Sequence, residues 1–543
     1  MFIIQKLKLT IMKYSFSLFI FCFLFNFNSN SQINSTFLEH NNVSAYISDA
    51  GTYFLNFVNP GMGYEVPKGS GRHAIYTTQF WFAGKDGLDS LHFVQGGSPS
   101  QGRDIFNGPV SGVGTYTSPE YQAAWSNSMW SICQSDIDQF KLWWECQNGI
   151  ITTGCGSVNP PSNEALQTIF DWPAHGDVSS GQSFYLAPFY DYNSDGIYDP
   201  NDGDYPIIKG CCATYLIQND VAEAHSYTNT DSIGIELHIM FYQYQTWDYL
   251  NDVTFIDIKA INRGGINYPE FAHSIFVDAD LGYYGDDFFG CDSVNNVMYF
   301  YNADNNDEDG FPALGYGVDP PALGIVTLQQ EMSSCAYYMN AGGNLISEKW
   351  NIMNGLQFSG NPWVNPSGNE TQFVYSGNPN VPLEWSEISA GNPSGDRRGI
   401  SSTSVGAFNG GDTLLQSYAI VYAREGNNLE NVQSIIDLAS QVQTFFDTES
   451  NIPCINGTWN VLELENLQIE IAPNPSSGIL YISSDQEKLT SIVIYNTQGK
   501  IVKEFTPSNF HKIEIDLSNQ SKGLYLIHIK SEKGISVQKI IIE

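Results

Sequence analysis

The chain has 543 residues, which is too long for one hydrophobic core and predicts two to four domains. Hydrophobic residues make up 42% of the chain and aromatic residues 14%, which excludes a disordered protein. The formal net charge of −35 argues against nucleic acid and anionic membranes as partners, and it favours divalent cations and neutral or cationic partners.

The first 31 residues have the pattern of a secretory signal peptide. Three lysines come before or at the start of an apolar run at residues 14–25, and Ser29 and Ser31 lie at the small-residue positions before a cleavage point. The run is too short to span a bilayer, and no later stretch is long enough. We therefore expect no transmembrane segment in the mature chain, with a retained anchor as the alternative.

The charge is distributed unevenly along the rest of the chain. From residue 466 to residue 543, eight lysines balance eight acidic residues, so the excess of acid belongs to the region before it. This contrast predicts an acidic central region at residues 32–455, a linker at 456–465 and a C-terminal domain at 466–543. The central region is long enough for two sub-domains.

Eight cysteines follow residue 31, and an even number in an exported chain predicts disulfides. Cys146 and Cys155 are spaced to close a small loop, and the adjacent Cys211 and Cys212 are expected to bond to different partners. The sequence leaves the remaining pairing open. The absence of CxxC pairs disfavours a zinc site.

Strands dominate the central region. Residues 73–84 and 251–263 are predicted strands, and bulky residues on both faces of the second indicate a strand covered on both sides, as in a sandwich. In residues 232–241, Ile235, Leu237 and Ile239 alternate with Glu236 and His238, which predicts a strand with one buried face.

One amphipathic helix is predicted, over residues 427–446. Seven apolar residues recur on one face at a spacing of 3.6, and Asn427 is placed to cap the helix with Glu430 three positions on. The expected fold class is therefore all-β, mostly antiparallel sandwiches, with one late helix. Residues 359–396 are rich in proline and glycine and predict long surface loops.

The stretch DYNSDGIYDPNDGDYP, at residues 191–206, has the ligand spacing of a calcium loop. The spacing is that of an EF-hand loop, with side-chain ligands at positions 1, 3, 5, 9 and 12, a glycine at 6 and a carbonyl ligand at 7. The predicted ligands are Asp191, Asn193, Asp195, the carbonyl of Ile197, Asp199 and Asp202. The loop resembles those of dockerin modules and thrombospondin type 3 repeats, which also have Asp at position 12.

Prolines at 200 and 206 forbid the helix that follows such a loop in those modules, so we expect a structural calcium site rather than a sensor. An acidic turn without a metal is the alternative. Two further acidic stretches, at residues 278–292 and 304–310, lack a ligand schedule and predict solvated loops. Their alternatives are a second calcium site or a carboxylate pair for glycoside hydrolysis.

No nucleophile motif is present: there is no GxSxG, no HExxH and no phosphate-binding glycine loop. His175 and His238 are expected to serve packing or hydrogen bonding. Four tryptophans lie in apolar contexts and are expected in the core rather than on a sugar-binding surface, namely Trp81, Trp143, Trp144 and Trp172. No residue is assigned a catalytic role.

After residue 466 the sequence predicts a small antiparallel sandwich of about seven short strands. Its motifs resemble those of the type A C-terminal sorting domain of proteins exported by the type IX secretion system. They are PNP with a following glycine, YNTQGKIV, DLSNQSKGLYLIHI and a lysine near the end. The matching residues are Pro473, Asn474, Pro475, Gly478, Gly499, Lys500, Gly523 and Lys539.

The resemblance implies export through the periplasm, recognition of the tail by the type IX machinery at the outer membrane, and a secreted or outer-surface location. In such proteins the tail is usually removed during export. The central region is similar to a group of secreted bacterial proteins without an assigned activity that carry the same tail, through YEVPKGSGRHAIY, FDWPAHG, DYNSDGIYDPNDGDYPIIKG and VDADLGYYGDDFFGCD. The adjacent cysteines of GCCATYL depart from that pattern.

Together these observations predict a calcium-stabilised protein of the cell surface or medium with a binding, adhesive or structural role and an unknown extracellular ligand. The alternative is a secreted hydrolase acting on polysaccharide.

Overall fold

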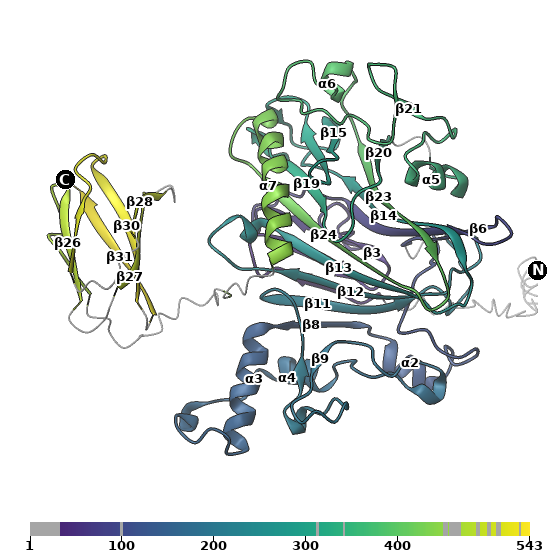
Figure 1. The fold of residues 1–543 in the computed structure, drawn as a ribbon, viewed down its shortest axis with the longest axis horizontal. Helices are drawn as coiled ribbons and strands as arrows, with labels where there is room; N and C mark the ends of the chain where they lie inside the picture. The colour runs from purple at the N-terminus through teal and green to yellow at the C-terminus, as the bar shows by residue number, and fades with distance from the viewer. Residues whose placement is uncertain are drawn as a thin grey trace, which may run out of the picture. The chain divides into compact units, whose positions relative to one another are not determined.

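The computed structural model describes residues 33–97, 101–310, 314–339, 343–448, 454, 469–484, 489–496, 501–505, 512–531 and 534–542. Its contacts divide the chain into two compact units, Met1–Asn456 and Gly457–Glu543 (Figure 1). The predicted signal peptide at 1–31 and the predicted linker at 456–465 lie outside the described residues. Within the described part, no helix combines the length and the apolar character needed to cross a membrane.

The first unit is built on two antiparallel sheets. The larger has nine strands, in the order β15 (Asp287–Asp292), β16 (Val297–Asn302), β19 (Ala322–Thr327), β24 (Thr413–Ala423), β13 (Thr254–Asn262), β12 (Ile235–Gln243), β11 (Cys212–Asn219) and β7 (Phe106–Asn107), with β8 (Met129–Cys133) also paired to β11. The smaller has six, in the order β20 (Ser334–Tyr338), β23 (Arg397–Phe408), β14 (Tyr268–Ala279), β5 (Thr77–Lys85) and β3 (Thr52–Tyr53), with β6 (Leu91–Val94) beside β5.

The two sheets pack face to face and enclose the main hydrophobic core, as in a sandwich. Alternate residues of each strand point into it, so Phe80 and Phe82 of β5 lie in this core, and the Phe80 ring stacks on Tyr418 of β24 at 6.1 Å between centroids. A second core covers the opposite face of the nine-stranded sheet. The protein is mostly β, as the sequence predicts.

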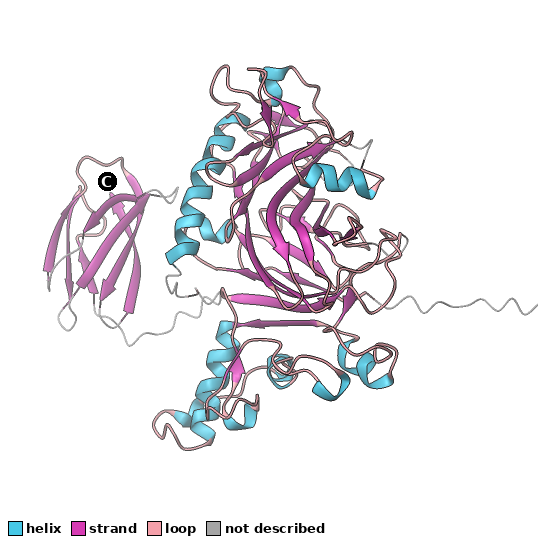
Figure 2. Cartoon of the chain, turned by 45° about the vertical axis from the view of Figure 1, so that its right-hand side comes forward, coloured by secondary structure: helices cyan, strands magenta, loops and turns pink. Residues whose placement is uncertain are grey.

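The second core is closed by helices (Figure 2). The predicted late helix is α7 (Asn428–Thr448), which packs on β16, β19 and β24. Asn427 accepts hydrogen bonds from the backbone N–H groups of Leu429 and Glu430, and the Glu430 carboxylate accepts from the Asn427 N–H, all at 3.0 Å. The predicted helix and its cap are confirmed.

Further helices lie in segments for which no helix is predicted from the sequence. They are α2 (Pro119–Trp125), α3 (Gln134–Gln147), α4 (Asn163–Phe170), α5 (Ile346–Met353), α6 (Glu387–Ala390) and the 3₁₀ turns η1 (Cys155–Ser157), η2 (Val178–Ser180), η3 (Pro200–Asp202) and η4 (Tyr249–Asp252). The helices α2, α3 and α4 lie next to β8, beyond the edge of the nine-stranded sheet (Figure 1).

Short strands complete the first unit. They are β1 (Ser35–Leu38), β2 (Ser44–Ser48) and β4 (Tyr64–Glu65) in one sheet, and the pairs β9 (Phe189–Tyr190) with β10 (Tyr205–Pro206), β17 (Asn306–Asp307) with β18 (Gly317–Val318), and β21 (Trp363–Val364) with β22 (Glu370–Thr371). The last pair and α6 interrupt the predicted surface loops at 359–396.

Strand β12 differs from the prediction of one buried face, because every residue of it is buried. Its polar face is not solvated but paired: His238 donates from Nε2 to Glu236 at 3.0 Å, and Glu236 also binds Arg263 at 2.9 Å. A buried ion network therefore takes the place of water on this face.

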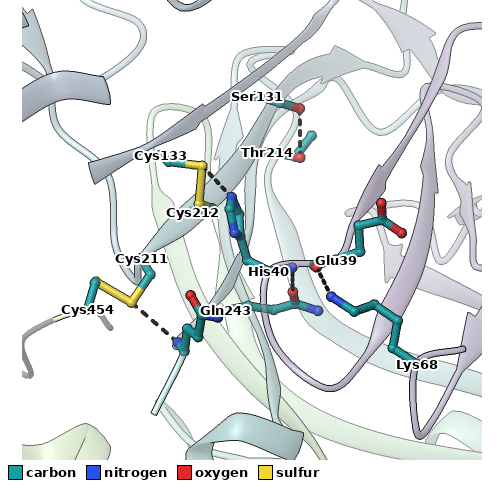
Figure 3. The surroundings of a disulfide bond; sticks show 11 residues. Glu39, His40, Lys68, Ser131, Cys133, Cys211, Cys212, Thr214, Gln243 and Cys454 are labelled. Atoms are coloured by element: carbon teal, nitrogen blue, oxygen red, sulfur yellow. Dashed lines mark hydrogen bonds between the residues drawn. A yellow bond between two sulfur atoms is a disulfide. The ribbon is translucent and has the colours of Figure 1, made fainter. Parts of the chain in front are cut away.

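Three disulfides are formed among the described residues. Figure 3 shows two of them, Cys133–Cys212 and Cys211–Cys454. Cys146 bonds to Cys155, which confirms the predicted small loop. The adjacent cysteines also bond apart as predicted, Cys212 to Cys133 on the neighbouring strand β8 and Cys211 to Cys454. Cys291 and Cys335 are buried thiols.

The second unit is an antiparallel sandwich, as predicted, with a three-stranded and a four-stranded sheet. The strands are β25 (Ile469–Ala472), β26 (Ile479–Ser484), β27 (Leu489–Asn496), β28 (Ile501–Phe505), β29 (Lys512–Asp516), β30 (Gly523–Ser531) and β31 (Gly534–Ile542). Leucine, isoleucine and tyrosine side chains from both sheets form its separate core.

Candidate functional site

The acidic loop at residues 191–202 folds around one carboxylate. Asp191 accepts hydrogen bonds from the backbone N–H groups of Ser194 at 2.7 Å, Asp195 at 3.3 Å and Gly196 at 2.7 Å. Gly196 has φ +81°, the left-handed conformation that glycine adopts without strain. The sharp turn that the calcium schedule requires at position 6 is therefore present.

The other predicted ligands are engaged within the loop. The Asn193 amide donates to Asp195 at 3.0 Å and to Asp202 at 3.3 Å, Asp195 also accepts from the N–H of Ile197, and Asp199 caps η3. Among the described residues, groups of three acidic, histidine or cysteine ligand atoms within 4.8 Å of one another lie elsewhere. The loop thus has the sharp turn at Gly196, and its carboxylates are not gathered on one point.

Neighbouring side chains fix this loop to the first unit. His175 accepts the N–H of Tyr198 at its Nε2, at 2.8 Å, and its Nδ1 lies 3.2 Å from the carbonyl of Phe184. The Trp144 indole donates to the carbonyl of Asn201 at 2.8 Å. The buried Asp204 accepts from the N–H groups of residues 192 and 199, both at 2.8 Å. His175 therefore serves hydrogen bonding, as predicted, and so does His238 on β12.

The acidic stretch 278–292 is not the solvated loop that the sequence predicts, because its carboxylates are buried or half-buried. The stretch 304–310 is solvated as predicted at Asp304, Glu308 and Asp309, and Asp307 is the exception. Asp287 is 0% and Asp307 is 2% exposed, and burial raises the pKa of Asp307 to about 6 and that of Asp287 well above its usual range. The folding of 278–292 and 304–310 back on the sheets brings these carboxylates together. Their acid patterning resembles that of exposed turns, so sequence alone does not reveal their burial.

A cleft of about 550 Å³ lies on the outer face of the six-stranded sheet, and we call it the sheet cleft. Strand register places Gln79 and Trp81 of β5, Phe276 and Asp278 of β14, and Arg398 of β23 on this face. Helix α5, the loop after β3 and the loop after β6 complete the wall. The polar groups that line it are Thr52, Tyr76, Thr77, Gln79, Gln95, Gln101, Tyr227, Asp278, Tyr338, Asn344, Lys349 and Arg398.

Lys349 of α5 is the most perturbed cation of the sheet cleft. Its Nζ donates to Gln95 at 2.6 Å and lies 5.3 Å from the centre of the Trp81 ring and 5.5 Å from that of Tyr227. Burial lowers the pKa of this lysine to about 8. A desolvated ammonium between two aromatic faces is a strong recognition group for a polar ligand.

Asp278 faces the same cleft. Its Oδ2 lies 3.1 Å from Nε of Arg398, and burial raises the pKa of this carboxyl to about 7. The tryptophans give no open stacking platform: Trp81 is buried against Phe276 at 5.0 Å, and Trp172 is buried in the second core. The assignment of these two rings to the core is confirmed, and Trp143 and Trp144 are partly buried against the second core.

A larger hollow, of about 650 Å³, lies on the far face of the nine-stranded sheet. Four of its polar side chains are paired with one another: Tyr215 hydrogen-bonds to Nδ1 of His238 at 2.8 Å, and Lys209 binds Asp257 at 2.9 Å. The sheet cleft is therefore the stronger candidate site, since perturbed charges gather at it.

Two of the predicted sorting residues, Asn474 and Lys539, lie next to each other in the second unit. The Asn474 side chain donates to the carbonyl of Lys539 at 2.8 Å and accepts the N–H of Ile541 at 2.9 Å, which holds the PNP segment (Pro473 to Pro475) against β31. Gly478 has φ +122°, and a Cβ there would lie 2.6 Å from Cα of Ser518. Gly523 begins β30, and Gly499 and Lys500 lie outside the described residues.

Comparisons with known proteins bear on the two units differently. No curated protein matches the chain, so the resemblance of the central region stays a prediction. Two solved structures show slight likeness. A polysaccharide lyase has a TM-score of 0.17 and 8% identity, and the match covers 56% of this chain and 34% of the lyase. The BSP domain of a biofilm-associated protein has a TM-score of 0.16 and 8% identity, and the match covers 94% of this chain and 80% of that domain. The chain thus spans about a third of the lyase. We draw nothing on function from likenesses this weak.

The tail gives a definite result. Residues 470–543 match the family described as the secretion system C-terminal sorting domain. This match covers the second unit and agrees with the motifs and the fold described above. Residues 470–543 therefore form a secretion system C-terminal sorting domain, which supports handling by the type IX secretion machinery and indicates export to the cell surface or the extracellular space.

Proposed function

We propose that the first unit is a carbohydrate-binding module of the cell surface or medium, and that the sheet cleft is its binding site. The observation that carries this proposal is the composition of the cleft wall, where three tyrosines, four side-chain amides, two threonine hydroxyls and three charged groups face one hollow. A polyhydroxylated ligand needs many short hydrogen bonds and a few aromatic surfaces, and this wall offers both.

The charged groups suit a saccharide with acidic substituents. Lys349 supplies the cation for such a substituent, because it donates to the neutral Gln95, whereas Arg398 is bound by Asp278 and Asp396. The first unit is strongly acidic, so a buried lysine at the cleft wall stands out from the overall charge. A carboxylate or sulfate on a sugar ring would pair with Lys349 at low cost, because burial has already removed much of the water around that ammonium.

Hydrolysis of polysaccharide is the second candidate. The raised pKa of Asp278 favours it, because a general acid must hold its proton near neutral pH. A glycosidase requires two carboxyls that both reach the scissile bond, however, and Asp278 is the one carboxylate among the described lining residues. Binding without turnover fits this wall better.

Calcium is the second part of the proposal: the loop at 191–202 binds one ion and stabilises the region around α3 and α4. Its turn at Gly196 and its six predicted oxygen ligands support this role, and the short strand β10 that follows, in place of a helix, favours a fixed site. The binding of a saccharide does not depend on it.

Isothermal titration of the purified protein with neutral and acidic polysaccharides, together with an assay for released reducing ends, tests the function. We expect binding of an acidic polysaccharide without new reducing ends. Tyr227→Ala and Lys349→Met should each weaken it at least fivefold, whereas Tyr185→Ala, which removes a tyrosine of the larger hollow, should leave it unchanged. If the protein releases reducing ends and Asp278→Asn abolishes that release, the protein is a hydrolase. If only Tyr185→Ala loses binding, the binding site is the larger hollow instead.

A further inference from the structure

Three carboxylates meet where two neighbouring strands of the six-stranded sheet pass each other. Asp278 lies near the end of β14, Asp280 follows that strand, and Asp396 comes directly before β23. The strands are antiparallel and pair Asp278 with Arg398, so the end of one meets the start of the other. One oxygen of each carboxylate lies within 4.8 Å of the other two. We call this group the acidic triad.

The positive charge beside the acidic triad is too small to balance it. Arg398 binds both Asp278, at 3.1 Å from Nε to Oδ2, and Asp396, at 3.3 Å from Nη2 to Oδ2. The neighbouring Arg397 does not offset this charge, because it forms an ion pair with both carboxylate oxygens of Glu387. Three carboxylates thus face one guanidinium, which leaves an excess of two negative charges when all three are ionised.

Asp278 is the buried member of the acidic triad. Its side chain is 9% exposed, and its Oδ1 has no hydrogen-bond partner among the described residues. A buried carboxylate oxygen without a partner is costly, and native proteins satisfy such atoms with water or an ion. The Asp396 carboxylate lies within hydrogen-bonding reach of the Asp278 carboxylate, so two acidic groups face each other at this point.

We propose that Asp278, Asp280 and Asp396 bind a divalent cation. The three side chains offer only oxygen, which selects calcium or magnesium over zinc, whose protein sites use histidine and cysteine. A charge of +2 cancels the excess that Arg398 leaves. The ion gives Oδ1 of Asp278 its partner and separates the facing carboxylates of Asp278 and Asp396.

Burial and the mutual repulsion of the carboxylates agree with this assignment. Burial first, and then the charges of Asp278 and Asp396, raise the pKa of Asp280 to about 8. An ion would remove that penalty, because a cation favours the ionised form of each ligand. Asp278 also lines the sheet cleft, so the ion would sit behind one wall of that cleft and hold it in shape.

This inference stands apart from the proposed saccharide and from the loop at 191–202, and metal alone tests it. The purified full chain is freed of metal with a chelator and titrated calorimetrically with calcium and with magnesium, in the background Asp195→Ala, which disables the loop. We expect one remaining site. Asp280→Asn and Asp396→Asn should each weaken it at least tenfold, and Asp437→Asn, an exposed position on α7, should leave it unchanged.

Equal affinity in all these proteins, or no ion bound at all, would overturn the assignment and would mean that the triad shares protons instead. If the asparagine variants fail to fold, crystals of the unaltered protein grown with manganese replace them. We expect an anomalous peak in contact with the three carboxylates. A peak elsewhere, or none, refutes the site whatever the cleft binds.

Discussion

Arg397 and Glu387 form a bidentate ion pair that joins β23 to α6. Nε and Nη2 of the arginine each lie 2.9 Å from a carboxylate oxygen, and the side chains are 1% and 0% exposed. Glu387 also accepts the N–H of Phe289 at 2.8 Å and the amide of Asn392 at 2.9 Å. The pair therefore connects three segments of the first unit at one buried point.

Breaking this pair from one side should destabilise the fold strongly. Glu387→Ala leaves a guanidinium buried without its partner, and we expect the free energy of unfolding to fall by about 3–5 kcal/mol. The double variant Glu387→Leu with Arg397→Met should lose less than Glu387→Ala alone, because no charge is then left buried. Urea denaturation followed by tryptophan fluorescence measures both. A loss below about 1 kcal/mol for the alanine variant would contradict the pair's role.

The disulfides should differ in what they contribute. Cys211–Cys454 joins residues 243 apart in sequence, whereas Cys146–Cys155 joins residues 9 apart. Since the entropy removed from the unfolded chain grows with the loop, Cys454→Ser should cost up to about 3 kcal/mol more than Cys155→Ser. Thermal denaturation of the two variants, compared at equal pH, checks the order. An equal or reversed order would show that local strain or residual structure decides instead.

Calcium should raise the melting temperature of the protein. Extracellular sites of this loop type bind with dissociation constants of about 10⁻⁴ to 10⁻³ M, so a hundredfold excess stabilises the fold by about 2.7 kcal/mol. Asp195→Ala should reduce the shift between calcium and chelator, and Asp437→Ala should not. Scanning calorimetry with calcium and with chelator measures it. If the Asp195→Ala protein shows the same shift in melting temperature as the unaltered protein, the loop is an acidic turn that binds no calcium.

Lys349 should make stability depend on alkaline pH. Burial lowers its pKa from the usual 10.5 to about 8 in the folded protein, so the folded state disfavours the charged form. The resulting penalty, up to about 3 kcal/mol, is present below pH 8 and disappears as the pH rises from 8 to 10.5. Lys349→Met should therefore be more stable than the unaltered protein at pH 7, with the difference vanishing near pH 10.

The exposed Lys259 serves as the control, because its replacement by methionine removes a charge without relieving burial. The measurement is the free energy of unfolding in urea at pH 7, 8.5 and 10. A difference that stays constant across this range would mean that Lys349 is solvated in the folded protein.

Deletion of the tail should block export. A chain without residues 466–543 lacks the sorting domain, so we expect it to accumulate in the periplasm, whereas the full chain reaches the surface or medium. Cell fractionation and immunoblotting distinguish the two. Asn474→Ala, which removes the two hydrogen bonds to β31, is a milder test of the same signal. Normal export of the truncated chain would refute the role of the tail.

Local patterns predict the parts of this fold that depend on neighbours in sequence. The cap and apolar face of α7 and the small loop of Cys146 and Cys155 are confirmed, because each involves residues within a few turns of chain. Helix α3 is different: its apolar residues are spread around its axis, and its packing against β8 and the disulfide at Cys146 supply what its pattern lacks.

The candidate site depends on positions far apart in the sequence. The sheet cleft joins residues of β3, β5, β14, α5 and β23, and the register that places Asp278 opposite Arg398 is set by strand pairing over 120 residues. Lys349 is the one local signal, a lysine in the apolar stretch KWNIM. The burial of Asp287 and Asp307 also depends on contacts between distant segments, and the sequence around each residue is typical of a solvated turn.

The bond between Cys211 and Cys454 has a consequence for the protein after export. Cys454 comes after α7 and before the matched sorting domain, so removal of the tail at any point beyond it leaves a new carboxyl terminus that is still covalently tied to the residue preceding β11. Carboxypeptidases that trim this end would be arrested at the crosslink, and α7 would keep its place over the second core. Once the sorting domain is removed, the new carboxyl-terminal segment of the first unit would thus be held by a disulfide rather than left as a free end.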